Sequence, residues 1–249
     1  MAASRVALIT GAGRGIGLSA TKLFLKNGYR VVASDLNLQQ ARAELSSAGS
    51  KKIAFLEGDV TKEADVKEMA RAALTNFGQL DSAVLNAGNL SRVLPWLETP
   101  HEDVDKMLDV NIKGSWLTAK HAAQAMIDSP SQGKGGSLVF VSSVASLYGQ
   151  PGMSAYCASK WAVRGLSLAS AAEFAPYGIR SNCIQPGATD TAMFGSFPPE
   201  LQAAVTAGIP LGRPAQPDEI AEVMLFLAGD KSSFMNGATV AVHGGQTPT

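Results

Sequence analysis

The chain has 249 residues, of which 46% are hydrophobic, so it can bury a substantial core as a single domain. Its 21 Lys and Arg residues balance its 21 Asp and Glu residues, and this zero net charge predicts no nucleic-acid partner and no attraction to an anionic membrane. Two cysteines, three scattered histidines and the lack of a leader or a long apolar run predict a cytoplasmic protein without a disulfide framework, a metal site or a membrane span.

The first predicted element is a short apolar strand, residues 6–9, which runs into a glycine-rich turn and then into a helix over residues 18–26. Such a turn presents unpaired backbone N–H groups and the positive end of a helix dipole to an anion, which predicts a cradle for a pyrophosphate. Gly11, Gly15 and Gly17 have the spacing G-x-x-x-G-x-G, which differs from the G-x-G-x-x-G of the dinucleotide fingerprint. On its own, the loop is therefore also compatible with a plain tight turn.

The choice between NAD and NADP depends on two side chains near this loop. A second strand, residues 30–34, is followed by Asp35, close to the spacing at which an acid binds the ribose hydroxyls of the adenosine. A carboxylate there would repel the additional phosphate of NADP, which favours NAD. Arg14 favours NADP instead, because a guanidinium in the glycine loop can bind a phosphate. We weight Asp35 more, since it lies where the ribose is expected.

Two further strands, residues 52–56 and 80–85, end in residues that suit a cofactor. Asp59 and Val60 follow the third strand, and Asp59 can either accept a hydrogen bond from the adenine amino group or cap the helix predicted over residues 62–77. The fourth strand ends in Asn86-Ala87-Gly88, whose small residues allow the backbone to approach a cofactor.

The alternation of strands with helices predicts an α/β fold, a single-domain Rossmann-type doubly wound parallel sheet of about seven strands with helices on both faces. The remaining strands are predicted at residues 137–141, 179–185 and 238–242, and the remaining helices at 38–48, 101–127, around Tyr156 and at 217–228. We expect residues 5–90 to form mainly the cofactor half and residues 91–249 mainly the catalytic and substrate half.

Asn111 and Gly114 lie in the middle of the helix predicted over residues 101–127. Both residue types are unfavourable inside a helix. They indicate a kink or a functional role at this position.

Tyr156 and Lys160 lie four residues apart on a predicted helix and therefore share one of its faces. A free tyrosine has a pKa near 10 and a neighbouring cation favours the phenolate. We therefore expect Lys160, together with the positive charge of an oxidised nicotinamide, to lower the pKa of Tyr156 and make it a general acid and base. Ser143 follows the strand over residues 137–141, where its hydroxyl can hold a substrate oxygen. Taken alone, the pair is also typical of an ordinary amphipathic helix.

The segment after Pro186-Gly187, over residues 187–212, is rich in glycine, proline, alanine and apolar residues, including Met193 and Phe194. We expect a lid over the substrate, with a connecting helix that packs its apolar side as the alternative. Residues 90–96, 145–150 and 193–197 are expected to build the pocket. Their composition indicates an uncharged, moderately apolar substrate.

Together these motifs resemble the short-chain dehydrogenase/reductase family in its compact single-domain form. The resemblance covers the chain from Val6 to about Gly245 and rests on the glycine loop, Asn86-Ala87-Gly88, Asn111, Ser143, Tyr156-x-x-x-Lys160, and Pro186-Gly187 with Thr191 and Met193. Leu85 and His243 stand where the family usually has asparagine and aspartate. His243 falls in a region that often lies at a subunit interface in relatives.

The resemblance implies that Tyr156 is the acid and base, that Lys160 lowers its pKa and binds the nicotinamide ribose, that Ser143 orients the substrate oxygen and that Asn111 anchors a water of the proton relay. Thr189 and Thr191 would hold the nicotinamide amide. The residues expected at the cofactor are Gly11, Arg14, Gly15, Ile16, Gly17, Asp35, Asp59, Val60, Asn86, Ala87, Gly88, Tyr156, Lys160, Pro186, Gly187, Thr189 and Thr191. Those expected at the substrate are Ser143, Tyr156, Met193 and Phe194.

We therefore expect an oxidoreductase, of the class acting on CH–OH groups, that transfers a hydride between NAD(H) and a secondary alcohol or ketone and works as a homotetramer or homodimer. The first alternative is an NADPH-dependent ketone reductase of the 3-oxoacyl or polyketide type, which Arg14 favours. The second is a non-catalytic NAD(P)-binding protein, against which the complete set of Ser143, Tyr156 and Lys160 argues.

Overall fold

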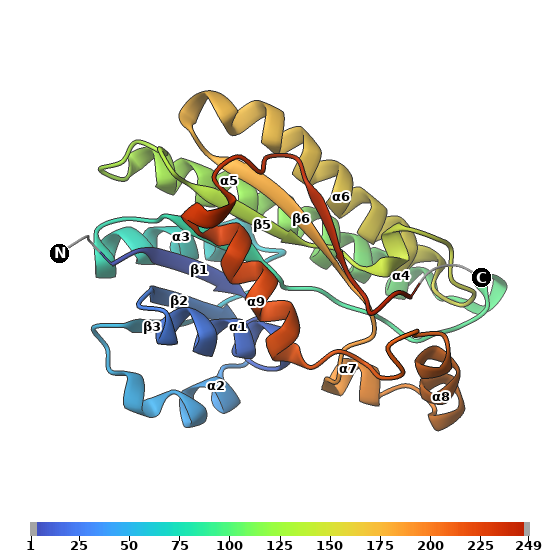
Figure 1. Ribbon diagram of the computed structural model, residues 1–249. Coiled ribbons are helices and arrows are strands. Elements are labelled where there is room, and N and C mark those ends of the chain that lie inside the picture. The colour runs from blue at the N-terminus through green and yellow to red at the C-terminus, as the bar shows by residue number, and fades with distance from the viewer. Residues whose placement is uncertain (1–3, 247–249) are drawn as a thin grey trace.

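The computed structural model describes residues 4–246 and is built around one parallel sheet of seven strands in the order β3-β2-β1-β4-β5-β6-β7 (Figure 1). This confirms the predicted doubly wound fold. The strands are β1 (Val6–Thr10), β2 (Arg30–Asp35), β3 (Ile53–Glu57), β4 (Ser82–Leu85), β5 (Ser137–Val141), β6 (Arg180–Pro186) and β7 (Thr239–Val242).

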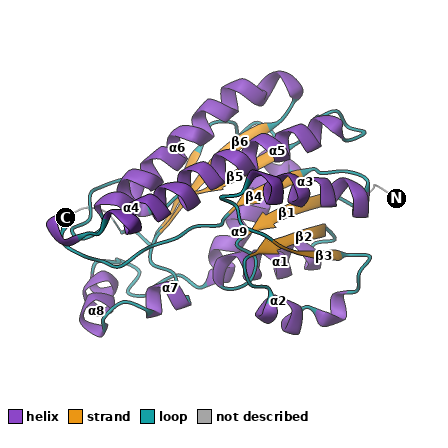
Figure 2. Ribbon diagram, turned by 180° about the vertical axis from the view of Figure 1, so that it is seen from behind, coloured by secondary structure: helices purple, strands orange, loops and turns teal. Residues whose placement is uncertain are grey.

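Helices cover both faces of the sheet (Figure 2). One face carries α1 (Gly15–Lys26), α2 (Gln39–Glu44) and α9 (Pro217–Ala228), and the other carries α3 (Glu63–Phe77), α5 (Gly114–Asp128) and α6 (Ser154–Phe174). The residues of β1 alternate between the two cores, with Val6 and Leu8 in one and Ala7 and Ile9 in the other. A strand that is buried on both sides has to be apolar throughout, which explains the continuous hydrophobic runs in the sequence.

The direction of the chain reverses beside β1. From β1 the chain moves outward through β2 and β3, and it then returns to the other side of β1 as β4. The helices that follow β1 and β4 therefore lie on opposite faces, and a crevice opens beyond the carboxyl ends of these two strands. The site described below occupies this edge of the sheet.

The helix predicted over residues 101–127 is divided into three parts. A π-helical turn, Leu108–Lys113, separates α4 (His101–Met107) from α5 and contains Asn111. Such turns are rare and frequently mark functional sites, and this one confirms the irregularity that was predicted at Asn111. The predicted helix over residues 38–48 also differs, since α2 ends at Glu44 and a separate 3₁₀ turn covers Ser46–Ala48. Within residues 4–246, no helix combines the length and the apolar character needed to cross a membrane.

Candidate active site

The glycine loop between β1 and α1 lines a cavity of about 660 Å³ at the carboxyl edge of the sheet. Gly11 and Gly15 have φ angles of +66° and +53°, and a Cβ at Gly17 would lie 2.0 Å from the Gly11 carbonyl oxygen. The loop can therefore hold no side chains at these positions. The first N–H groups of α1, on Gly15, Ile16 and Gly17, have no partner one turn earlier in the helix, so the loop forms a cradle for an anion.

Asp35 stands at the end of β2 and faces the same loop. Its Oδ2 accepts a hydrogen bond of 2.9 Å from the Gly13 N–H, and its Oδ1 accepts one of 3.2 Å from the Asn37 N–H. Arg14 precedes α1, is exposed, and lines the cavity as Asp35 does. The two side chains that argue for different cofactors are thus both at the cavity, and Asp35 additionally holds the glycine loop in place.

Asp59 and Asn86 serve neighbouring loops. Asp59 Oδ1 accepts hydrogen bonds from the backbone N–H and the hydroxyl of Thr61, at 2.9 and 2.8 Å, so it closes a turn ahead of α3 and does not cap the helix itself. Asn86 Nδ2 donates to the carbonyl oxygens of Thr10 and Gly11, both at 3.1 Å, and ties the end of β4 to the glycine loop. Asp59, Val60, Asn86, Ala87 and Gly88 all line the cavity.

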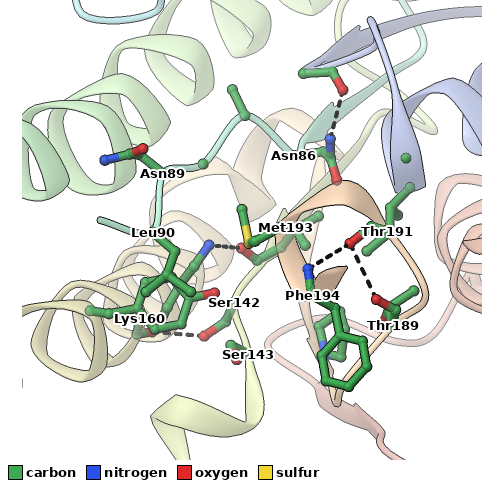
Figure 3. A pocket seen from close by; sticks show the side chains of 18 of the residues that line it. Asn86, Asn89, Leu90, Ser142, Ser143, Lys160, Thr189, Thr191, Met193 and Phe194 are labelled. Carbon is green, nitrogen blue, oxygen red and sulfur yellow. Dashed lines mark hydrogen bonds between the residues drawn. The ribbon is translucent and has the colours of Figure 1, made fainter. Parts of the chain in front are cut away.

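Ser143, Tyr156 and Lys160 meet in the cavity from two elements, the end of β5 and the first turns of α6. Lys160 is 5% exposed, and its Nζ donates a 3.0 Å hydrogen bond to the Val141 carbonyl and lies 5.6 Å from the centre of the Tyr156 ring. Ser142 fastens α6 to the strand, because its hydroxyl donates to the Lys160 carbonyl at 2.7 Å. Figure 3 shows Lys160 beside Ser142 and Ser143, with Thr189, Thr191 and Phe194 across from them.

Asn111 is fully buried and, unlike the other predicted site residues, is not part of the cavity lining. Its Nδ2 donates to the Asn89 carbonyl and the Ser159 hydroxyl, both at 2.9 Å, and its Oδ1 accepts from the Asn89 N–H at 2.7 Å. The side-chain amide therefore joins α6 to the loop after β4. The role of Asn111 in a proton relay stays a prediction, and its side chain is already occupied by these three bonds.

The segment after β6 lies over the cavity. It contains α7 (Ala192–Gly195) and α8 (Pro199–Ala207), neither of which has a buried residue. Its two ends are joined by backbone hydrogen bonds from Asp190 to Ala215 (2.8 Å) and from Ala215 to Ala188 (2.9 Å). The residues that line the cavity from the end of β6 and this segment are Pro186, Gly187, Ala188, Thr189, Thr191, Ala192, Met193, Phe194, Phe197, Leu201 and Val205. A segment that is joined at its ends and faces a cavity is suited to act as a lid.

Comparisons with known proteins agree with this geometry. A family model described as enoyl-(acyl carrier protein) reductase matches residues 11–247. The chain is 37% identical to trans-4-hydroxycyclohexanecarboxylate dehydrogenase of Sinomonas cyclohexanicum, over 98% of this chain and 93% of that protein. It is 36% identical to a 3-oxoacyl-(acyl-carrier-protein) reductase of Thermotoga maritima, over 97% of each protein. The crystal structure of a short-chain type dehydrogenase/reductase from Mycobacterium marinum has a TM-score of 0.92 and 34% identity, and the match covers 99% of this chain and 97% of that one.

The chain belongs to the short-chain dehydrogenase/reductase family. This confirms the resemblance and the predicted class of enzyme, an oxidoreductase that acts on CH–OH groups and takes a nicotinamide cofactor.

The cavity of this short-chain dehydrogenase/reductase fits a dinucleotide. A Cβ at Gly13 would lie 2.2 Å from the Asn37 carbonyl oxygen, and one at Gly11 would lie 2.7 Å from Asn86 Nδ2, so side chains are excluded where a pyrophosphate has to approach the backbone. The cradle of N–H groups and the carboxylate of Asp35 lie at one end, and Tyr156 and Lys160 lie on the same continuous cavity wall. These features match a ligand with a phosphate group, a ribose and a reactive ring.

The electrostatics of Tyr156 differ from the expectation. Burial raises the pKa of Tyr156 to about 12, and its hydrogen bond with Ser143 offsets this only in part. Burial also lowers the pKa of Lys160 to about 8. Tyr156 therefore has a raised pKa in this structure, and the lowering of this pKa by Lys160 stays a prediction. The ammonium is directed to the Val141 carbonyl, and desolvation of the phenol outweighs any attraction between the two groups.

The substrate part of the cavity was predicted only in outline. Leu90 and Val93 line it as expected, but Trp96 is 78% exposed and does not. Sequence reasoning missed several lining residues, namely Lys106, Val110, Pro151, Met153 and Gln246. Leu201 and Val205 lie within the predicted lid but outside the range 193–197 that was expected to build the pocket. Gln246 follows the glycine pair after β7, and the pair was the one sign in the sequence that the chain turns sharply there.

Proposed function

We propose that the protein interconverts a secondary alcohol and a ketone, with Tyr156 as the general acid and base. The observation that carries the proposal is that Ser143, Tyr156 and Lys160 share one cavity with the glycine loop. In ketone reduction, the Tyr156 phenol donates its proton to the carbonyl oxygen, which Ser143 holds by a hydrogen bond. In alcohol oxidation, the phenolate removes the hydroxyl proton. A bound nicotinamide supplies or accepts the hydride.

Lys160 has two tasks in this proposal. Its buried ammonium stabilises the Tyr156 phenolate that remains after proton transfer, and it binds the nicotinamide ribose. Thr189 and Thr191 hold the nicotinamide amide, and Met193 and Phe194 contact the substrate. The other residues proposed to hold the cofactor are Gly11, Arg14, Gly15, Ile16, Gly17, Asp35, Asp59, Val60, Asn86, Ala87, Gly88, Pro186 and Gly187.

The proposed cofactor is NAD, because Asp35 faces the loop where the ribose is expected. Two unit charges 4 Å apart interact by about 4 kcal/mol at an effective dielectric constant near 20, so a carboxylate can exclude the extra phosphate of NADP. Asp35→Asn removes the charge but keeps an oxygen that accepts from the Gly13 N–H. We expect the ratio of kcat/KM for NADP to that for NAD to rise at least about tenfold in this variant.

Steady-state assays with both cofactors and a panel of secondary alcohols test the proposed activity and the role of Asp35 in choosing the cofactor. Asp59→Asn is the matched control, since it removes another cavity carboxylate, and it is expected to change the ratio by less than about threefold. A wild-type preference for NADP would assign the selection to Arg14. It would favour the second candidate, an NADPH-dependent ketone reductase of the 3-oxoacyl type; the relative from Thermotoga maritima is named a 3-oxoacyl-(acyl-carrier-protein) reductase.

The state of the two cysteines indicates the cellular compartment of the enzyme. Cys157 and Cys183 are free and buried, which supports a reducing compartment, and we propose the cytoplasm.

We also propose that the chain forms a homotetramer or homodimer. Adjoining helices α5 and α6 expose Trp116 (51%), Trp161 (47%) and Leu168 (46%), large apolar side chains of the kind that interfaces cover. Light scattering coupled to gel filtration is expected to give a mass of two or four chains. The double substitution Trp116→Glu with Trp161→Glu should lower that mass, whereas Leu97→Glu, at a position 99% exposed, should not. A monomeric wild type would contradict this proposal.

A further inference from the structure

The last strand, β7, is followed by a tight turn that packs against residues 209–211. Gly244 and Gly245 have φ angles of +61° and +85°, and Cβ atoms there would lie 2.9 Å from Ile209 and from Pro210. The Gly244 carbonyl accepts a 3.2 Å hydrogen bond from the Leu211 N–H. The turn is therefore packed against the returning end of the lid. Its two central positions favour glycine, because their φ angles are positive and a side chain would meet the lid.

Gln246 follows this turn and is 8% exposed, and it lines the cavity. Its backbone N–H donates to the His243 carbonyl at 3.0 Å. Its side-chain Oε1 lies 3.5 Å from the Ala188 N–H, and a Cβ on Gly187 would approach it to 3.0 Å. The carbonyl end of the amide thus points to the backbone that leaves β6.

The other end of this amide has no such partner. Within residues 4–246, Gln246 Nε2 donates a hydrogen bond to no acceptor. It is also not among the fully buried side-chain atoms that lack a partner, so it keeps some accessible surface. Because the side chain lines the cavity and its Oε1 faces the Ala188 N–H, we infer that its NH₂ group faces the cavity. A donor in a largely apolar cavity is costly to leave unpaired when the cavity closes, so a ligand oxygen is its natural partner.

The geometry points to Gln246 as a specificity-determining residue. We propose that its amide donates to a second oxygen of the substrate, a carbonyl or carboxylate oxygen separate from the one that Ser143 and Tyr156 hold. Gln246 lies beside Gly187 at the end of β6 and follows the turn that packs on the returning lid, and the lid residues Leu201 and Val205 line the same cavity. The carboxylates that line the cavity from the described residues are Asp35 and Asp59, which belong to the glycine-loop side, so no acidic group opposes an oxygen-rich substrate here. The inference rests on the proposed ketone and alcohol chemistry of this site.

Matched ketones test it. The probes are cyclohexanone, 4-oxocyclohexanecarboxylate and the methyl ester of that acid, which share one ring and differ in the second oxygen group. We expect the wild type to reduce the acid or the ester at least about tenfold more efficiently in kcat/KM than cyclohexanone. Gln246→Met keeps the length of the side chain and removes the donor. It should remove this preference while changing cyclohexanone reduction by less than about threefold.

Gln246→Glu adds a second test, because a carboxylate at this position should reject the acid more strongly than the ester. The ratio of two substrates on one preparation does not depend on the fraction of folded enzyme, so a destabilised variant still gives an answer. Unchanged ratios in both variants would overturn the inference and leave the proposed function intact. Weaker NADH binding with an equal loss on all three ketones would assign the amide to the cofactor and also overturn it. A wild type that reduces none of the probes would contradict the proposed function and the inference together.

Discussion

Replacing Tyr156 by phenylalanine is expected to lower kcat at least about a thousandfold in both directions, while NADH binds with an unchanged dissociation constant. The phenol is the group that the site offers for proton transfer, and the substitution removes one oxygen atom without opening a cavity at the ring. Steady-state kinetics with saturating cofactor measures the first effect, and a fluorescence titration with NADH measures the second.

Tyr148→Phe is the matched control, because Tyr148 is another phenol that lines the same cavity. We expect its kcat to stay within about tenfold of the wild type, since it is not paired with Ser143 or Lys160. A Tyr156→Phe variant that retained most of its turnover would exclude the proposed proton transfer. Equal losses in the two variants would point to a packing effect shared by both rings.

The pH dependence of the two directions gives a second check on Tyr156. Because burial raises its pKa to about 12, the phenol is neutral at pH 6–8 and ready to protonate a ketone. Alcohol oxidation needs the phenolate. At pH values well below the pKa, the phenolate fraction rises about tenfold for each unit by which the pH increases. We therefore expect kcat/KM for oxidation to rise between pH 6 and 8 and that for reduction to stay nearly constant.

The sequence predicted those parts of the site that depend on neighbours along the chain. The glycine loop, the strand ends and the Tyr156–Lys160 pair follow from spacing within one or two elements, and the structure places all of them at one cavity. Asp35 also lies at the predicted strand end, because a strand of known length delivers the residue after it to the edge of the sheet.

Other features depend on contacts between distant segments. The Asn111 amide is saturated by Asn89 and Ser159, which lie 22 and 48 residues away, and no local pattern indicates either bond. Gln246 reaches the cavity because the lid returns beside the last turn. The raised pKa of Tyr156 could not be predicted from the sequence, because burial, which only the folded packing determines, is its largest cause.

Lys160→Met is expected to abolish most of the activity and yet to stabilise the fold at neutral pH. Burial lowers the pKa of Lys160 from 10.5 to about 8, and a shift of this size corresponds to about 3 kcal/mol of lost stability at pH 7. Methionine fills similar space without a charge, but it gives up the hydrogen bond to the Val141 carbonyl, at a cost of about 1 kcal/mol. We expect a net gain of about 1–3 kcal/mol in the free energy of unfolding at pH 7. We also expect kcat to fall at least about a hundredfold, because the phenolate of Tyr156 loses its cation.

The stability difference between Lys160→Met and the wild type should depend on pH. The folded-state pKa of Lys160 is below that of the unfolded chain, so the penalty on the wild type is complete below pH 8 and fades as the pH rises from about 8 to 10.5. The stability advantage of Lys160→Met over the wild type should shrink across this range in urea unfolding experiments. Lys67→Met, on the exposed face of α3, is the control and should change stability by less than about 0.5 kcal/mol at every pH. A Lys160→Met variant that is less stable than the wild type at pH 7 would show that the buried ammonium supports the fold. In that case the Val141 carbonyl and its surroundings would offset, within the folded state, the cost of burying the ammonium.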